Sequence, residues 1–130
     1  MTEQLSPLAL QALAVVEESG AIIGANHAHP HTIRHKGRID LVTETDIAVE
    51  AFLKERLATL APQAGFLAEE SAEDLSLPDT CWIIDPVDGT TNFAHGLPLT
   101  VTSVAYRLNG EIVLGIVNAP LLRECFIAEK

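Results

Sequence analysis

The sequence predicts an α+β fold in which helices are layered on a mostly antiparallel β-sheet. Two stretches with helical periodicity occupy the first half of the chain, and short apolar segments separated by turn residues occupy the second half. Early helices followed by consecutive strands are typical of this class, because each hydrophobic face needs another layer to cover it. A chain of 130 residues, 48% of them apolar, is expected to form one domain with its own core.

The first predicted helix covers residues 5–23, where apolar side chains recur at helical spacing. Ser6-Pro7 suits its start, because proline lacks an N–H group that the first turn would leave unpaired. The basic segment 26–39 is predicted to be irregular. Its histidines alternate around a proline at a spacing that no standard zinc site uses, which favours a solvated turn; they are His27, His29, His31 and His35.

A second helix is predicted over about residues 44–60, where valine and leucine residues one turn apart form a buried stripe. Thr43, followed three residues later by Asp46, resembles a capping box at the start of this helix. Pro62 is expected to end it.

Five strands are predicted after the second helix, each a short apolar segment bounded by turn residues. The third and fourth form a hairpin, because Asn109-Gly110 is a favoured two-residue turn. The predicted strands cover residues 65–68, 82–84, 101–108, 112–117 and 124–128.

The most informative stretch of the chain runs from Trp82 to Phe93, WIIDPVDGTTNF. Its apolar triplet is predicted to be a buried strand whose pairing ends at Pro86, because proline cannot donate to the ladder. Asp85 and Asp88 would then face one point just past the strand end, where their charges repel each other unless a cation lies between them. Oxygen ligands of this kind suit Mg²⁺.

The next residues predict an anion site beside that cation site. Gly89, Thr90 and Thr91 can open a helix whose free backbone N–H groups attract phosphate. The alternative for Asp88 is capping of this helix, although capping alone is a poor account of two aspartates. A cation site next to an anion site is what hydrolysis of a phosphate ester needs.

Composition excludes several classes of partner. Acidic residues outnumber basic ones by 18 to 8, and the net charge of -10 argues against nucleic acid or an anionic membrane as a partner. No apolar run is expected to reach the roughly 20 residues of a membrane span, and no signal peptide is predicted. Cys81 and Cys125 are expected to be reduced core residues, which favours a cytoplasmic location.

The aspartate stretch resembles the signature of the inositol monophosphatase family, a group of Mg²⁺-dependent, typically lithium-sensitive sugar-phosphate phosphatases. Its ending, Thr91-Asn92-Phe93 with a Gly-Leu-Pro behind it, is most similar to the branch that acts on inositol phosphates. Residues 41–46, LVTETD, resemble the first short motif of the family. Residues 69–71, Glu-Glu-Ser, match a second motif, with Ala68 where the family usually has glycine.

The resemblance implies a role for each matched residue. The metal ligands would be Glu69, Asp85, Asp88 and the backbone carbonyl of Val87. Glu69 and Thr90 would orient and deprotonate the attacking water, and Asp46 would pair with the hydroxyl of Thr90 or help to hold a weaker metal. Phosphate oxygens would bind the backbone N–H groups of Gly89, Thr90 and Thr91.

The resemblance covers nearly all of the chain but only the N-terminal part of the family's length. Residues 1–130 would therefore be the metal- and phosphate-binding part, without the C-terminal region that completes the metal site and grips the sugar. The expected function is Mg²⁺-dependent hydrolysis of inositol monophosphate or a similar sugar phosphate by a metal-activated water. The alternatives are a truncated, non-catalytic module of the same family, a fructose-1,6-bisphosphatase or a nucleotide-bisphosphate phosphatase. An exposed sheet edge also predicts a homodimer.

Overall fold

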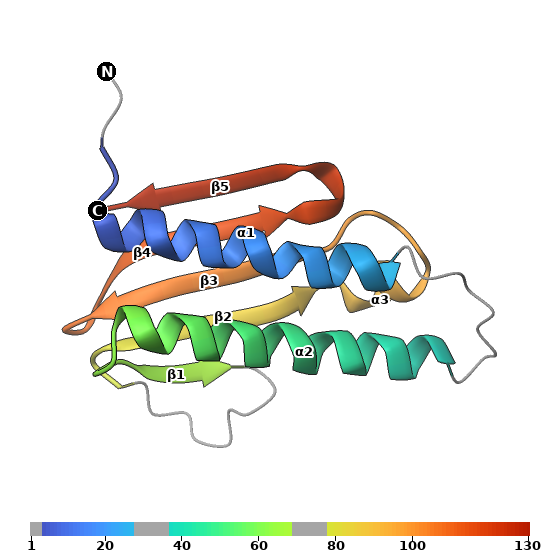
Figure 1. The fold of residues 1–130 in the computed structure, drawn as a ribbon, viewed down its shortest axis with the longest axis horizontal. Helices are drawn as coiled ribbons and strands as arrows, with labels where there is room; N and C mark the ends of the chain where they lie inside the picture. Colours follow the sequence, from blue (N-terminus) through green and yellow to red (C-terminus); the bar gives the residue numbers. More distant parts are fainter. Residues whose placement is uncertain (1–3, 28–36, 69–77) are drawn as a thin grey trace.

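Two long helices cover one face of a five-stranded sheet in the computed structural model of the chain, which describes residues 4–27, 37–68 and 78–130. Helices α1 (Pro7–His27) and α2 (Gly37–Leu60) lie side by side over this face (Figure 1). The predicted α+β class, with helices layered on a sheet, is confirmed.

The strands follow one another across the sheet in chain order. Among the described strands, β1 and β2 pair in parallel and the other neighbouring pairs are antiparallel, which agrees with the predicted, mostly antiparallel sheet. A short helix, α3 (Thr90–Ala94), connects β2 to β3, and a 3₁₀ turn, η2 (Pro120–Leu122), connects β4 to β5. The strands are β1 (Gly65–Ala68), β2 (Cys81–Asp88), β3 (Val101–Leu108), β4 (Glu111–Ala119) and β5 (Glu124–Glu129).

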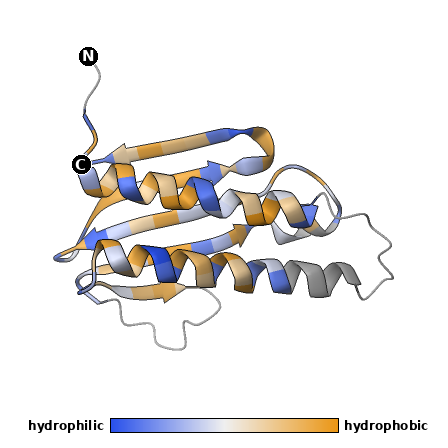
Figure 2. Ribbon diagram, viewed as in Figure 1, coloured by the Kyte–Doolittle hydropathy of each residue, from blue (hydrophilic) through white to orange (hydrophobic). Residues whose placement is uncertain are grey.

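The core lies between the helices and the sheet. Alternate residues of the strands pack into this core with residues of α1 and α2. Apolar stretches occur on both helices and on the strands (Figure 2). Within this core the rings of Trp82 and Tyr106 pack with their centroids 4.4 Å apart. The strand residues on this side include Ile84, Val104, Leu114, Ile116 and Ile127.

The start of α1 agrees with the prediction. The hydroxyl of Ser6 accepts a hydrogen bond from the N–H of Ala9 at 3.1 Å, which caps the helix one residue before Pro7. By length and composition α1 could also cross a membrane, contrary to the expectation that no run would be long enough. In this fold α1 packs on the sheet. A core helix of a folded domain can be as long and as apolar as a membrane-spanning helix.

The second helix is longer than predicted. It begins at Gly37 rather than near residue 44, so Thr43 and Asp46 lie inside it and the predicted capping box is wrong. The segment 26–39 is not irregular throughout: it starts in α1 and finishes in α2, while residues 28–36, with His29, His31 and His35, lie outside the described residues. Asn26 Nδ2 of α1 donates to Thr45 Oγ1 of α2 at 2.7 Å, which links the two helices.

The prediction that Pro86 ends the pairing of its strand is also wrong. Strand β2 continues to Asp88, but its register with β3 shifts after Asp85. Pro86 and Val87 together face one residue, Thr102, which is the arrangement of a β-bulge. A bulge can include proline, because the ladder hydrogen bond that proline lacks is already interrupted there.

The remaining strands agree with the prediction. The turn between β3 and β4 has left-handed φ angles of 50° at Asn109 and 83° at Gly110, as a tight hairpin of this kind needs. The last strand, β5, pairs with β4 along its whole length and forms one edge of the sheet.

Candidate metal and phosphate site

The bulge in β2 brings two carboxylates to the same side of the sheet. Residues three apart in a regular strand point to opposite faces. Here Asp85 pairs with Ser103 and Asp88 pairs with Val101, and these partners are two residues apart on β3. The extra residue of the bulge therefore places Asp85 and Asp88 at positions on one face, as a shared cation would require. Asp85 is half-buried and Asp88 is exposed.

A buried hydroxyl holds the bulge in place. Thr102 Oγ1 donates to the carbonyl oxygen of Pro86 at 2.8 Å, and the side chain of Thr102 is fully buried. The bond satisfies a carbonyl that the shifted register removes from the regular ladder. Sequence reasoning missed Thr102, because its role depends on the register between two strands.

Gly89 connects this strand directly to α3. Its φ angle is +89°, and a Cβ atom at this position would lie 2.7 Å from the carbonyl oxygen of Leu99. Both facts require glycine here. The N–H of Phe93 donates to the carbonyl of Gly89 at 2.9 Å, so the first turn of α3 begins at the residue after the aspartate pair.

The loop after α3 is closed by hydrogen bonds. Asn92 Nδ2 donates to the carbonyl of Leu99 at 3.0 Å, and the N–H of Leu97 donates to the carbonyl of Asn92 at 2.8 Å. From α1, His27 Nε2 lies 3.0 Å from the carbonyl of Gly96. No pattern in the sequence pointed to these contacts of Asn92 and His27, which hold the loop that follows the aspartates. His95, in the turn that follows α3, is exposed.

Thr90 is the first residue of α3 and is exposed, and Thr91 follows it in the same helix. The helix has only five residues, so its dipole is small. A phosphate role for Gly89, Thr90 and Thr91 therefore depends on their N–H groups, which a first helical turn leaves without helical partners. This role stays a prediction.

Strand β1 ends at the same end of the sheet as the aspartates of β2. It runs parallel to β2, and Ala68 pairs with Ile84. The residue after Ile84 is Asp85, and the residue after Ala68 is Glu69. Glu69 lies outside the described residues, together with Glu70 and Ser71, so its predicted role is not tested.

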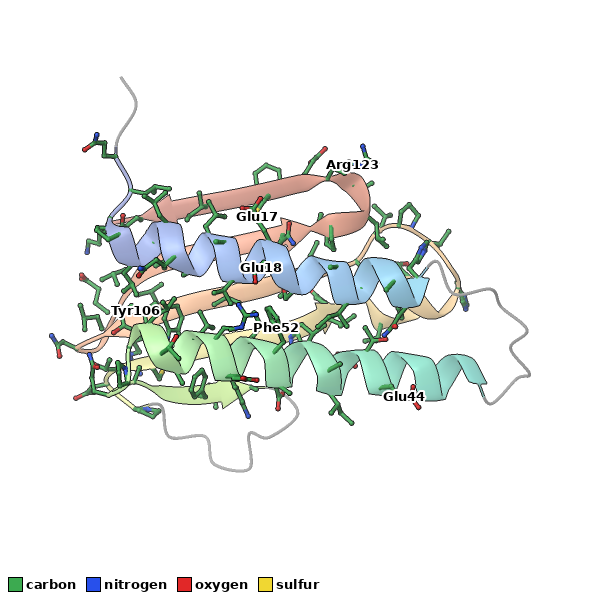
Figure 3. The ribbon with its side chains drawn as sticks, viewed as in Figure 1. Glu17, Glu18, Glu44, Phe52, Tyr106 and Arg123 are labelled. Atoms are coloured by element: carbon green, nitrogen blue, oxygen red, sulfur yellow. The ribbon has the colours of Figure 1, made fainter. Side chains whose placement is uncertain are left out.

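Asp46 lies in α2 and is only 8% exposed. Helix α2 as a whole packs on β2 and contacts α3. The neighbouring Thr45 is fully buried, whereas Glu44 is exposed and projects away from α1 (Figure 3). Since Asp46 is inside the helix, capping no longer explains this buried carboxylate.

The described residues offer a partial set of metal ligands. They contain no group of three His, Cys, Asp or Glu side chains that could hold a metal ion by themselves. Asp85, Asp88 and the carbonyl of Val87 are all oxygen donors, which fits a hard divalent cation better than a soft one. The third predicted carboxylate, Glu69, is beyond the described part.

Both cysteines are free thiols, as predicted. Burial raises the pKa of Cys81, and the nearby Arg107 opposes this effect only in part. Burial also raises the pKa of Cys125, helped by the charge of Glu17. Both groups therefore stay protonated near neutral pH and are poor metal ligands.

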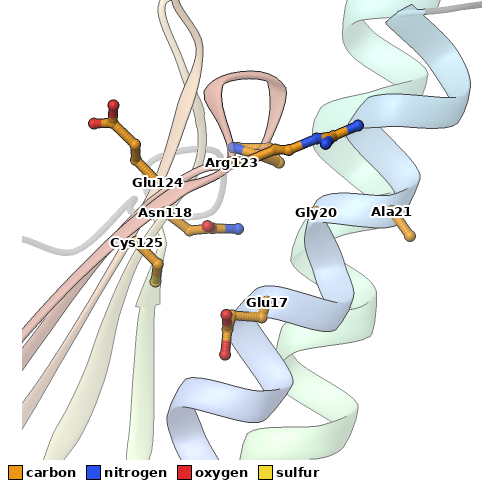
Figure 4. A pocket seen from close by; sticks show the side chains of 8 residues that line it. Glu17, Gly20, Ala21, Asn118, Arg123, Glu124 and Cys125 are labelled. Carbon is orange, nitrogen blue, oxygen red and sulfur yellow. The ribbon is translucent and has the colours of Figure 1, made fainter.

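A separate hollow of about 560 Å³ lies away from the aspartates. Glu17 and Gly20 of α1 line one side of it, and Asn118, Arg123 and Cys125 line the other (Figure 4). Its charges have mixed signs, and none of the residues predicted to bind metal or phosphate lines it.

Comparison with known proteins identifies the family. The model of the inositol monophosphatase family matches residues 4–130. An inositol monophosphatase of Dictyostelium discoideum is 44% identical over 123 residues, which are 92% of this chain and 45% of that protein. A fructose-1,6-bisphosphatase/inositol-1-monophosphatase of Thermotoga maritima is 43% identical over 91 residues, 70% of this chain and 35% of that protein.

Solved structures agree with this result. The structure of a Thermotoga maritima IMPase has a TM-score of 0.75 and 34% identity, covering 92% of this chain and 46% of that one. The chain thus spans about half the length, or less, of the relatives it matches. On the family match and these identities, the chain belongs to the inositol monophosphatase family.

Proposed function

We propose that this chain is the metal- and phosphate-binding part of a Mg²⁺-dependent phosphatase that hydrolyses inositol monophosphate or a similar sugar phosphate. One observation carries the proposal: the bulge in β2 gives Asp85 and Asp88 positions on one face, immediately before the start of α3. Membership of the family supports the reaction class. The exit of β1 beside Asp85 supports Glu69 as a third carboxylate.

Each residue of the site has a proposed task. The cation would be held by Asp85, Asp88, Glu69 and the carbonyl of Val87. When bound, it would act as a Lewis acid next to the phosphate. Glu69 and Thr90 would orient the attacking water and take its proton. The N–H groups of residues 89–91 would orient the phosphate oxygens for in-line attack. Asp46 would fix the hydroxyl of Thr90.

Further properties belong to the same proposal. We expect lithium to inhibit the reaction, as the family resemblance implies, and we expect a cytoplasmic location, which the two free thiols support. We also expect a homodimer formed through the open edge of β5. Light scattering tests the last point, and a mass equal to the 14.0 kDa monomer would contradict it.

Two alternatives have specific support. The Thermotoga maritima relative is named a fructose-1,6-bisphosphatase as well as an inositol-1-monophosphatase, so fructose 1,6-bisphosphate is the second candidate substrate. The coverage of only 45% of the Dictyostelium relative supports a non-catalytic module that needs further residues for activity. A nucleotide bisphosphate is the third candidate substrate.

The test is release of phosphate from inositol 1-phosphate by the purified chain, with and without Mg²⁺. Asp88→Asn keeps the size of the side chain but removes its charge, and fructose 1,6-bisphosphate is assayed in parallel. Mg²⁺-dependent release that Asp88→Asn abolishes is the expected result. Release that persists unchanged in Asp88→Asn would contradict the proposed site, and no release from the wild type would favour the non-catalytic alternative.

A further inference from the structure

The last two residues of α1 bond to two different elements. Asn26 Nδ2 donates to Thr45 Oγ1 of α2 at 2.7 Å. His27 Nε2 lies 3.0 Å from the carbonyl oxygen of Gly96, in the turn after α3. A carbonyl oxygen can only accept, so Nε2 carries the proton of this hydrogen bond. We call Asn26 and His27 the α1 end, and Figure 1 shows it beside α3.

The ring of His27 also packs on α3. Its centroid lies 6.0 Å from the ring centroid of Phe93, with the two planes tilted by 47°. Phe93 is a residue of α3 and is only 4% exposed, because its side chain joins the core. His27 therefore holds α3 in two ways, by a ring contact within the helix and by a hydrogen bond just past its end.

Helix α3 depends on contacts of this kind, because a helix of five residues is not stable in water by itself. A Schellman motif closes its end: the N–H of Gly96 donates to the carbonyl of Phe93 at 3.0 Å, and the N–H of Leu97 donates to that of Asn92 at 2.8 Å. Gly96 has the left-handed φ angle of 75° that this motif needs. The bond from His27 thus ties α1 to the residue that ends α3.

The other bond of the α1 end lies next to a predicted site residue. Thr45 is fully buried, and Asp46 follows it in α2. Neighbouring Cα atoms are only about 3.8 Å apart, so two adjacent residues hold both this turn of α2 and the end of α3. In the proposed function Asp46 fixes the hydroxyl of Thr90, which is the first residue of α3. The α1 end therefore links the two elements whose side chains that function requires to meet.

We propose that Asn26 and His27 are positioning residues, which hold α3 and its Thr90 in place relative to Asp46. The role is indirect, because the two residues act through α2 and α3 and not on the phosphate. Supporting contacts of this kind determine how precisely a site is arranged. The inference rests on the proposed function, but the placement of α3 can be measured without substrate or metal.

Amide hydrogen exchange of the purified chain, followed by NMR without Mg²⁺, measures how firmly α3 is held. His27→Phe keeps a ring beside Phe93 but removes the hydrogen bond, whereas His27→Gln keeps a donor. Asn26→Leu removes the bond to α2 at similar size. Glu18→Gln is the matched control, because the ion pair of Glu18 with Arg56 joins the same two helices at an exposed place, 3.0 Å apart.

His27→Phe should speed exchange of the Gly96 and Leu97 amides about two- to tenfold, the range for loss of one hydrogen bond. Asn26→Leu should speed the same amides, because it releases the α1 end from α2. His27→Gln should restore part of the protection, and Glu18→Gln should match the wild type. Unchanged exchange in His27→Phe or in Asn26→Leu would overturn the proposal. An increase spread evenly over the sheet would also overturn it, since the two residues would then support the fold as a whole.

The phosphate-release assay separates this inference from the proposed function. In a chain that releases phosphate, His27→Phe and Asn26→Leu should lower kcat more than they change KM, because the contact that orients the attacking water is disturbed. His27→Gln should restore part of kcat. Equal kcat in the wild type and both variants would contradict the positioning role. Local changes in exchange without phosphate release from the wild type would count against the proposed function and still support the placement of α3 by the α1 end.

Discussion

Thr102 Oγ1 lies 2.8 Å from the carbonyl oxygen of Pro86, across the bulge that separates Asp85 from Asp88. This one hydrogen bond links β3 to the part of β2 that determines where the two aspartates lie. Because the hydroxyl is fully buried, water cannot replace it when it is removed.

Thr102→Val should therefore destabilise the fold although it barely changes the shape of the side chain. The carbonyl of Pro86 would lose its partner in a buried place, which costs about 1–3 kcal/mol. Urea denaturation measures the difference. Thr102→Ser keeps the hydroxyl and should recover part of the loss, so equal stabilities of the valine variant and the wild type would show that the bond contributes nothing.

Gly89→Ala should be more harmful than Gly96→Ala, although both glycines have positive φ angles. Each alanine meets the unfavourable left-handed conformation, which costs about 1–2 kcal/mol. At Gly96 no atom lies within 4 Å of the new Cβ, whereas at Gly89 the carbonyl oxygen of Leu99 lies at 2.7 Å. Thermal unfolding of the two variants compares them directly, and a Gly96 variant at least as damaged as the Gly89 variant would contradict this account.

Two glycines of α1 provide a second matched pair. Gly24→Ala adds a Cβ in open space and should stabilise the helix by up to about 1 kcal/mol, because alanine has the higher helix propensity. Gly20→Ala should destabilise, since its Cβ would lie 2.8 Å from Cβ of Pro120 and 3.0 Å from Nδ2 of Asn118. Opposite shifts in melting temperature are expected. Shifts of the same sign would argue against the close packing of α1 on η2.

Glu129 should make stability sensitive to acid. The hydroxyl and the N–H of Ser6 both donate to its carboxylate, and these bonds lower the pKa of Glu129 from its ordinary value of 4.5. A carboxyl group with a lowered folded-state pKa stabilises the fold above pH 4.5 and loses that contribution as the pH falls through the lowered pKa.

Melting temperature measured against pH tests this link. The wild type should lose more stability in acid than Glu129→Gln, which has no carboxylate to protonate. Glu124→Gln, on the same strand but exposed, should follow the wild type. Parallel curves for Glu129→Gln and the wild type would mean that the contact with Ser6 does not depend on the charge.

The parts of the fold that the sequence predicted depend on local signals. The hairpin of β3 and β4 was predicted because Asn109-Gly110 specifies its own turn, and the start of α1 because Ser6 caps it. The start of α2 was missed for the opposite reason. Thr43 and Asp46 look like a local cap, but the helix already begins at Gly37. Its packing on α1, which includes the bond from Asn26 to Thr45, joins distant residues and leaves no local pattern.

The same distinction applies to the site. The residue types of the aspartate motif predicted two carboxylates close together, but through a strand that ends at Pro86. The structure reaches a related arrangement by a bulge, whose position depends on Thr102 in the next strand. Periodicity within β2 alone could not reveal it, because one extra residue changes which face every later side chain occupies.

Binding of Mg²⁺ to the purified chain, measured by titration calorimetry, tests the central claim that Asp85 and Asp88 form one cation site. Asp88→Asn should weaken binding at least about tenfold, because loss of a direct ligand should cost no less than loss of a supporting one. Asp79→Asn, an exposed aspartate away from the bulge, is the control and should bind like the wild type. Equal affinities of the wild type and Asp88→Asn would contradict the claim.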